Sequence, residues 1–338
     1  MNFDVVITTC NRPEEVTRLS QEIFLCEPAP GKLIIVDSSD NVTSRFKDNV
    51  DVIHVKSSHK NQPYQRLLGA KVSLAEVIVF LDDDLSVLRK DIFKFLLEPF
   101  QGKDIVGTSV AFEHHNSTLQ KVEEPLLDGE SILIKVIWKI TGASSPEKGK
   151  MGRLGLTGLK PLTSSNVQSF NGASMAYIRN RIEKIIPDDL LSLYERKLGK
   201  GEDKVISMLA QQYGKLMYLP EVCLLHPPNE SSYFQDIRTF FAKVTYSRLY
   251  LSWVYAKVFN KLYAIEVLIY YWFTIWRILI ALFSWLARPS KGRKEKLLGI
   301  LDGFWLSLRL PQKAARLTPG LDWQAEIAKD LTASNVMI

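Results

Sequence analysis

Three consecutive aspartates, Asp82, Asp83 and Asp84, follow an apolar run of β-branched and aromatic residues at 77–81. A short run of this kind, bounded by polar residues, is typical of a buried strand. Carboxylates at its end repel one another and are costly to bury unless a cation lies among them. Mg²⁺ and Mn²⁺ prefer carboxylate oxygen, and Mg²⁺ is often shared with substrate phosphates. The run therefore predicts a metal and diphosphate site at a strand end, and a solvated acidic turn is the alternative.

The elements that must position these aspartates alternate along the first half of the chain. We expect strands at residues 3–8, 32–36, 51–55, 77–81 and 104–111, and helices at residues 12–24, 62–73 and 88–98. Alternation of this kind predicts an α/β fold with a mostly parallel sheet and helices on both faces. In such sheets, ligands bind outside the carboxyl ends of the strands. The chain has 338 residues, enough for one large domain and a smaller appendage.

Polar side chains follow the first, second and fourth expected strands. They are Thr8, Thr9, Asn11 and Arg12, then Asp37, Ser38 and Ser39, and then the three aspartates. Because these strands are expected to run in parallel, their ends should line a single crevice. Arg12, at a helix start, can either meet a phosphate or cap exposed surface. Three polar clusters at one edge strengthen the interpretation of the aspartates as a ligand site.

Four segments of the chain, in order, resemble the motifs of the family 2 glycosyltransferases, which have the GT-A fold. They are VVITTCNRPEEVTRL at residues 5–19, LIIVDSSDN at 33–41, VIVFLDDDL at 77–85 and GEDKVISML at 201–209. The resemblance covers about residues 1–230. It implies a Rossmann-like domain that uses a nucleotide-diphospho-sugar.

The resemblance also implies roles for individual residues. Thr9 and Asp37 would contact the base and ribose of a nucleoside-diphosphate sugar, and Asp82 would contact the nucleotide. Asp84 would bind Mg²⁺ or Mn²⁺, and Asp83 is the middle residue of the family's Asp-X-Asp motif. The full set that we expect to bind the nucleotide-sugar is Thr8, Thr9, Asn11, Arg12, Asp37, Ser39, Arg66, Asp82, Asp83 and Gly172.

The pair Glu202–Asp203 stands directly before an apolar helical run. An inverting sugar transfer needs a base that deprotonates the acceptor hydroxyl. The resemblance assigns this role to Asp203, with Glu202 as its support, whereas a capping pair at a helix start is the structural alternative. By resemblance, His226 is a further metal ligand, although a histidine at a strand end often has only a structural role. Gly172 lies in a small-residue segment that resembles the loop near the donor sugar, and an ordinary turn is its alternative.

The expected helix at residues 62–73 departs from the family pattern. Residues 61–69 read NQPYQRLLG, which keeps Asn61, Arg66 and Gly69 of that pattern.

Two other functions stay open. A nucleotidyltransferase also uses strand-end aspartates and a metal, but it would release pyrophosphate and would not need Asp203. The other is an inactive, membrane-bound GT-A scaffold.

The positive charge of the chain is concentrated near its C-terminus. The whole sequence has 43 Lys or Arg and 37 Asp or Glu, a net charge of +6. Residues 243–316 hold 13 Lys or Arg and 3 Asp or Glu, a net +10, so the remainder carries −4. A basic segment can bind nucleic acid, but this one is also rich in Trp, Tyr, Leu and Ile. That composition favours an anionic membrane surface and no nucleic acid.

The apolar stretch at residues 267–287 is long enough to cross a bilayer, with Arg277 at its centre. A second apolar stretch, at residues 297–310, follows a basic cluster. Aromatic and basic residues are interleaved from residue 246 onward, which favours helices that lie in the membrane interface. A single span and a soluble, buried bundle are the alternatives.

We therefore expect three parts: a GT-A domain at residues 1–242, a membrane-associated helical segment at 243–316 and a tail at 317–338. The N-terminus does not resemble a signal peptide. We expect the protein at the cytoplasmic face of the cell membrane, either monotopic or with a single span. The expected activity is an inverting, metal-dependent transfer of a hexose to a hydroxyl of a lipid-linked glycan or polysaccharide precursor.

Overall fold

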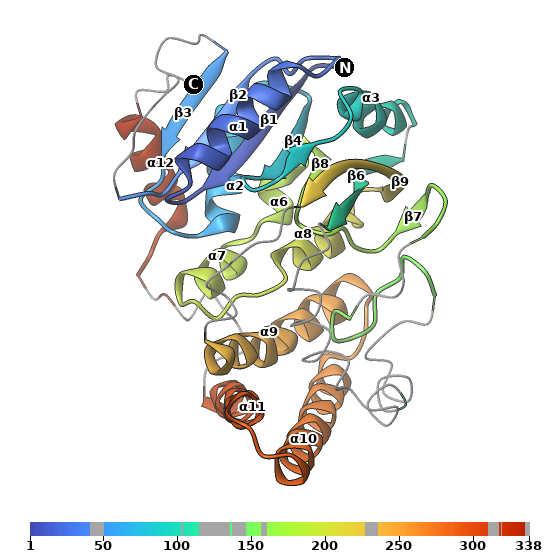
Figure 1. Cartoon of the computed structure of the whole chain (residues 1–338), viewed down its shortest axis with the longest axis vertical. Coiled ribbons are helices and arrows are strands. Elements are labelled where there is room, and N and C mark those ends of the chain that lie inside the picture. The colour runs from blue at the N-terminus through green and yellow to red at the C-terminus, as the bar shows by residue number, and fades with distance from the viewer. Residues whose placement is uncertain are drawn as a thin grey trace.

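The computed structural model describes residues 1–40, 51–102, 104–114, 136, 147–156, 161–226, 236–309, 318 and 320–334. A sheet with covering helices forms one end of the molecule, and three long helices from the C-terminal part of the chain form the other (Figure 1). The arrangement confirms the expected α/β fold.

Within the described residues, the strands form one sheet of nine, in the order β3-β2-β1-β4-β8-β6-β9-β5, with β7 paired to β9. The strands are β1 (Phe3–Thr9), β2 (Leu33–Asp37), β3 (Val52–Lys56), β4 (Val77–Asp82), β5 (Ser86–Val87), β6 (Ile105–His114), β7 (Ser165–Val167), β8 (Ser174–Ile178) and β9 (Lys215–His226). The first four strands pair in parallel, as expected. However, β8 is antiparallel to both β4 and β6, so the sheet is mixed.

Both faces of the central strands are buried, which explains their nearly continuous apolar sequences. Val5 and Ile7 of β1 belong to the core that α1 (Pro13–Phe24) and α3 (Ile92–Leu97) cover. Val6 belongs to the core on the other face, with α2 (Gln62–Val72). A Cβ at Gly69 would lie only 2.5 Å from Val6 Cγ1, so α2 packs directly against β1. This close packing fixes the side chains of α2 beneath the strand ends.

The chain after the aspartates is extended where the sequence predicts a helix from residue 88. Ser86 and Val87 form β5 beside β9, and the Leu88 amide donates to the Cys223 carbonyl at 2.9 Å. Helix α3 therefore begins only at Ile92, and a 3₁₀ turn at Glu98–Gln101 follows it. Three further helices follow β8: α6 (Ile182–Ile185), α7 (Asp188–Glu195) and α8 (Glu202–Ala210). They share with α2 the core on one face of the sheet.

The C-terminal helices are α9 (Ile237–Val258), α10 (Tyr263–Ala287), α11 (Lys291–Arg309) and α12 (Trp323–Ala333). Of the described residues, α10 alone is long and apolar enough to cross a membrane by length and composition. Helix α9 begins before the domain boundary that we expect at residue 242, and that division of the chain stays a prediction.

Helix α12 returns to the sheet, although the sequence shows no strong periodicity beyond Pro311. Its Trp323 ring lies 5.2 Å from the His59 ring and 5.7 Å from the Tyr64 ring, centroid to centroid. Tyr64 Oη also donates to Asp330 Oδ2 at 2.9 Å. The last described helix thus covers the edge beside β3.

Candidate active site

The carboxyl ends of β1, β2 and β4 meet at one edge of the sheet. Thr9 is the register partner of Asp37, and Thr8 is the partner of Asp82. Because β8 runs in the opposite direction, its start lies at the same edge, and the Asp82 amide donates to the Ala173 carbonyl at 3.1 Å. Gly172, which the resemblance places near the donor sugar, therefore lies beside the polar strand ends.

Asp37 sits in a small hydrogen-bonded cluster. Ser39 donates to Asp37 Oδ1 from both its amide, at 2.7 Å, and its hydroxyl, at 2.5 Å. His54 Nε2 lies 3.6 Å from Asp37 Oδ2, and the Asn11 amide donates to Ser39 Oγ at 2.6 Å. Burial raises the pKa of Asp37, but the hydrogen bonds from His54 and Ser39 outweigh it and hold the pKa below its usual value. Asp37 is therefore held as an ionised carboxylate by its hydrogen-bond partners at this edge of the sheet.

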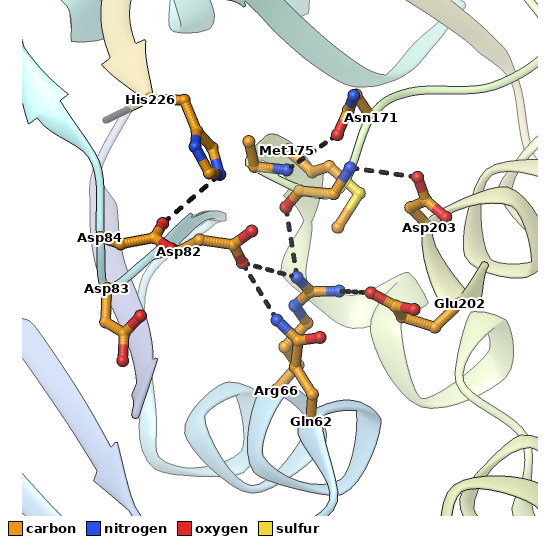
Figure 2. Close-up of polar contacts among 12 residues, drawn as sticks. Gln62, Arg66, Asp82, Asp83, Asp84, Asn171, Met175, Glu202, Asp203 and His226 are labelled. Carbon is orange, nitrogen blue, oxygen red and sulfur yellow. Dashed lines mark hydrogen bonds and ion pairs between the residues drawn. The ribbon is translucent and has the colours of Figure 1, made fainter. Parts of the chain in front are cut away.

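The first aspartate of the triplet faces the interior of the site (Figure 2). Asp82 Oδ1 accepts from Gln62 Nε2 at 3.0 Å and from Arg66 Nη2 at 3.1 Å. Burial raises the pKa of Asp82 to about 7, despite the opposing charge of Arg66.

The other two aspartates share the guanidinium of Arg12. Arg12 Nη1 lies 2.8 Å from Asp83 Oδ1 and 3.1 Å from Asp84 Oδ2. Thr9 Oγ1 also donates to Asp83 Oδ2 at 2.8 Å. Burial raises the pKa of Asp83, although Arg12 opposes this. The Arg12 side chain thus lies among the polar strand ends. It does not lie alone on exposed surface, as a residue that only caps the helix would.

Asp84 and His226 come together as candidate metal ligands. Asp84 Oδ1 lies 3.6 Å from His226 Nε2, so a carboxylate oxygen and an imidazole nitrogen face a common point (Figure 2). Throughout the part of the chain that the structure describes, no three His, Cys, Asp or Glu side chains are grouped to hold a metal by themselves. Mg²⁺ is commonly held by one or two carboxylates, with phosphate and water as its other ligands. The donor pair fits a divalent ion that is shared with a diphosphate.

Arg66 connects the strand ends to the helix that carries the second acidic pair. Its side chain is only 1 % exposed. Nη2 donates to Asp82 Oδ1 at 3.1 Å and to the Gly172 carbonyl at 3.2 Å, whereas Nη1 lies 3.4 Å from Glu202 Oε1. A buried cation is stable only with partners of this kind. The expected contact of Arg66 with the nucleotide-sugar stays a prediction.

The two acids at the start of α8 differ in their surroundings. Glu202 accepts a hydrogen bond from Tyr194 Oη, which in turn accepts from the Glu202 amide at 3.1 Å. Asp203 Oδ2 accepts from the Gly172 amide at 3.2 Å. Asp203 Oδ1 also accepts from the Lys204 amide at 2.9 Å, so this side chain satisfies an amide in the first turn of α8, as the capping alternative expects.

These surroundings shift the two pKa values in opposite directions. Burial raises the pKa of Glu202, but Arg66 and Tyr194 outweigh it and hold the pKa below its usual value. Burial and the negative charge of Glu202 raise the pKa of Asp203. Asp203 is therefore the stronger base of the pair, and Glu202 stays ionised to lower pH than Asp203.

Several residues of the site were missed by the sequence reasoning. Gln62 and Gln65 lie with Arg66 and Gly69 on one face of α2, and Gln65 Nε2 donates to the carbonyls of both Thr9 and Val36 at 2.9 Å. Their helical spacing is a signal that could have found them. No comparable signal marks Tyr194, whose hydroxyl meets Glu202 only through the fold of the chain between α7 and α8.

No protein-family model and no curated protein matches the chain. It is similar to S. aureus TarS 1-349 solved in complex with UDP-GlcNAc, at 11% identity and a TM-score of 0.49, over 99% of this chain and 88% of that chain. It is also similar to the mannosyltransferase PcManGT from Pyrobaculum calidifontis, solved in complex with GDP-Man and Mn²⁺, at 11% identity and a TM-score of 0.46, over 91% of this chain and 87% of that chain. Because both TM-scores are below 0.5, the assignment of the fold depends on the strand order of this chain.

Proposed function

We propose that the protein is an inverting, metal-dependent glycosyltransferase of the GT-A type, with the motifs of family 2. The observation that carries this proposal is the double ion pair of Arg66. One guanidinium lies 3.1 Å from Asp82, at a strand end, and 3.4 Å from Glu202, beside Asp203. This link supports a single site with a diphosphate end and a base end.

The donor is a nucleoside-diphosphate sugar. Thr9 and Asp37 contact its base and ribose, and Thr8, Asn11, Ser39 and Gly172 line the same edge. Arg12, Asp82 and Asp83 lie nearer the diphosphate. Support for this assignment comes from the register of β1, β2 and β4, which brings these strand ends together.

Asp84 and His226 would hold Mg²⁺ or Mn²⁺ together with the diphosphate. When bound, the ion supplies charge neutralisation for the departing nucleoside diphosphate. The 3.6 Å separation of the carboxylate oxygen and the imidazole nitrogen supports this donor pair.

Asp203 accepts the proton of the acceptor hydroxyl. The hydroxyl oxygen then forms a bond to the anomeric carbon, while the bond from that carbon to the diphosphate oxygen breaks and the electron pair leaves with the diphosphate. Attack on the face opposite the leaving group inverts the anomeric centre. The raised pKa of Asp203 and the ionised state of Glu202 support this division of roles, because a stronger base takes a hydroxyl proton more readily.

The proposed acceptor is a hydroxyl of a lipid-linked glycan or polysaccharide precursor at the cytoplasmic face of the cell membrane. Support comes from the packing of α8, which starts at the acids, against α9, the first of the aromatic and basic C-terminal helices. A hexose is the expected sugar.

The test is turnover of UDP-, GDP- and dTDP-hexoses with Mn²⁺ and a membrane lipid extract as acceptor. We expect the donor with one of these three nucleobases to release its nucleoside diphosphate. We expect Asp203→Asn to abolish this release. Glu183→Gln, on the exposed side of α6, is the matched control and should retain it. Release of pyrophosphate in a parallel assay, with a nucleoside triphosphate and a hexose 1-phosphate as substrates, would establish a nucleotidyltransferase. Release from none of the donors would favour the inactive scaffold.

A further inference from the structure

One side of α10 is apolar and exposed along its whole length. Its residues recur at spacings of three and four, and each is at least 36 % exposed: Ile265, Leu268, Trp272, Ile275, Leu279, Phe283 and Leu286. We call this set the apolar stripe. On the neighbouring helix α11, Leu301, Trp305 and Leu308 are exposed to a similar degree. An exposed apolar surface of the length of this stripe marks an interaction site.

The charged residues of α10 lie on its other side. Glu266 is 1 % exposed and pairs with Arg153 at 3.0 Å. Arg277 is 6 % exposed, and its Nη1 donates to Thr245 Oγ1 of α9 at 3.4 Å. The central arginine that the sequence places in a candidate span therefore faces protein, and the apolar stripe carries no charge.

Helix α11 lies antiparallel along α10. Tyr271 Oη donates to the Ser307 carbonyl at 3.1 Å, and further along α10, Ala281 shares a core with Leu297 and Ile300. This register places Asp302 beside the middle of α10. Asp302 is 41 % exposed and forms an ion pair with Arg238 of α9 at 2.5 Å.

If α10 crossed a bilayer, its packed neighbours would enter with it. The half-exposed pair Asp302–Arg238 would then lie near the bilayer centre, where charged side chains are most costly. An orientation parallel to the membrane surface avoids this cost. It buries the apolar stripe ~5–10 Å into the boundary between headgroups and acyl chains, as interfacial helices do.

The charges at the edge of this face favour an anionic lipid surface. Lys291 and Lys294, in the first turn of α11, are exposed, as are Arg288 before it and Arg309 at its end. Basic side chains beside an apolar face attract anionic headgroups, and exposed tryptophans are typical of the interface. We propose that the apolar stripe of α10 and the exposed face of α11 dock in plane on an anionic bilayer, and that α10 does not cross it. This inference rests on the location given in the proposed function.

The first test is co-sedimentation of the full-length protein with sealed vesicles of phosphatidylglycerol and phosphatidylcholine in equal parts. Leu268→Gln, Leu279→Gln and Leu286→Gln, combined, should lower the bound fraction by about tenfold or more. The matched control makes the same changes at Leu25, Leu74 and Leu88, which are exposed elsewhere. We expect the control to bind normally. Equal binding by both variants, or equal loss, would overturn the proposal.

The second test distinguishes docking from crossing. Cysteines are introduced by Ala264→Cys and Ala287→Cys, at exposed positions near the two ends of α10, with Cys10→Ser as background. After the protein binds to sealed vesicles, a membrane-impermeant maleimide should label both ends. Protection of one end would show that α10 crosses the bilayer.

Two controls separate this inference from its alternatives. Asp203→Asn should bind vesicles like the wild type, so a failure of the proposed chemistry leaves the membrane test intact. Light scattering without lipid measures self-association. A dimer that the triple glutamine variant abolishes, together with no vesicle binding, would show that a second copy of the chain covers the apolar stripe.

Discussion

The two carboxylate clusters of the site are built in different ways. The strand-end aspartates Asp82, Asp83 and Asp84 are adjacent in sequence, yet Asp82 pairs with Arg66 whereas Asp83 and Asp84 share Arg12. The acids at the start of α8 are also adjacent, but one faces Arg66 and the other faces the Gly172 amide. In the proposed function, the first cluster lies at the diphosphate end of the site, and the second supplies the base, Asp203, with Glu202 as its support. A shared arginine makes them one site.

The largest expected effect tests the base end alone. Asp203→Asn removes the proton acceptor and keeps the shape of the side chain, so turnover should fall by ~10²–10⁴-fold while donor binding stays unchanged. Steady-state kinetics with the active donor measures both quantities. Full turnover in the variant would remove Asp203 from the mechanism.

The next effect tests the link between the clusters. Arg66→Met leaves Asp82 and Glu202 without their buried cation, and should lower the free energy of unfolding by ~3–5 kcal/mol. Urea denaturation measures this change. Arg89→Met, at an exposed pair with Asp91, is the control and should have little effect. If the free energy of unfolding falls equally in the two variants, Arg66 does not stabilise the link between Asp82 and Glu202.

The smallest effect concerns pH. Because the pKa of Asp203 is raised, the base becomes protonated and turnover is lost as the pH falls through that raised value. Glu202→Gln removes the neighbouring negative charge that contributes to this shift. The acidic limb of the turnover profile should therefore move to lower pH in the variant. An acidic limb at the same pH, or at a higher pH, would show that Glu202 does not raise the pKa of Asp203.

The sequence predicts one cluster of this site better than the other. The apolar runs of β1, β2 and β4 end at their polar residues, so the position of Asp37 and the aspartates follows from local pattern alone. The partners of Arg66 lie far from it along the chain, and only the packing of α2 under the sheet brings them together. Tertiary contacts likewise set the reversed direction of β8 and the return of α12 to the sheet. No local periodicity in the sequence predicts either feature.

The most direct test of the account is calorimetric titration of the protein with the nucleoside diphosphate of the active donor, with and without Mn²⁺. It compares the wild type, Asp84→Ala and Asp203→Asn. We expect metal-dependent binding that Asp84→Ala loses and Asp203→Asn retains. Binding that is independent of metal, or that Asp203→Asn loses to the same extent as Asp84→Ala, would contradict the division of the site into a diphosphate end and a base end.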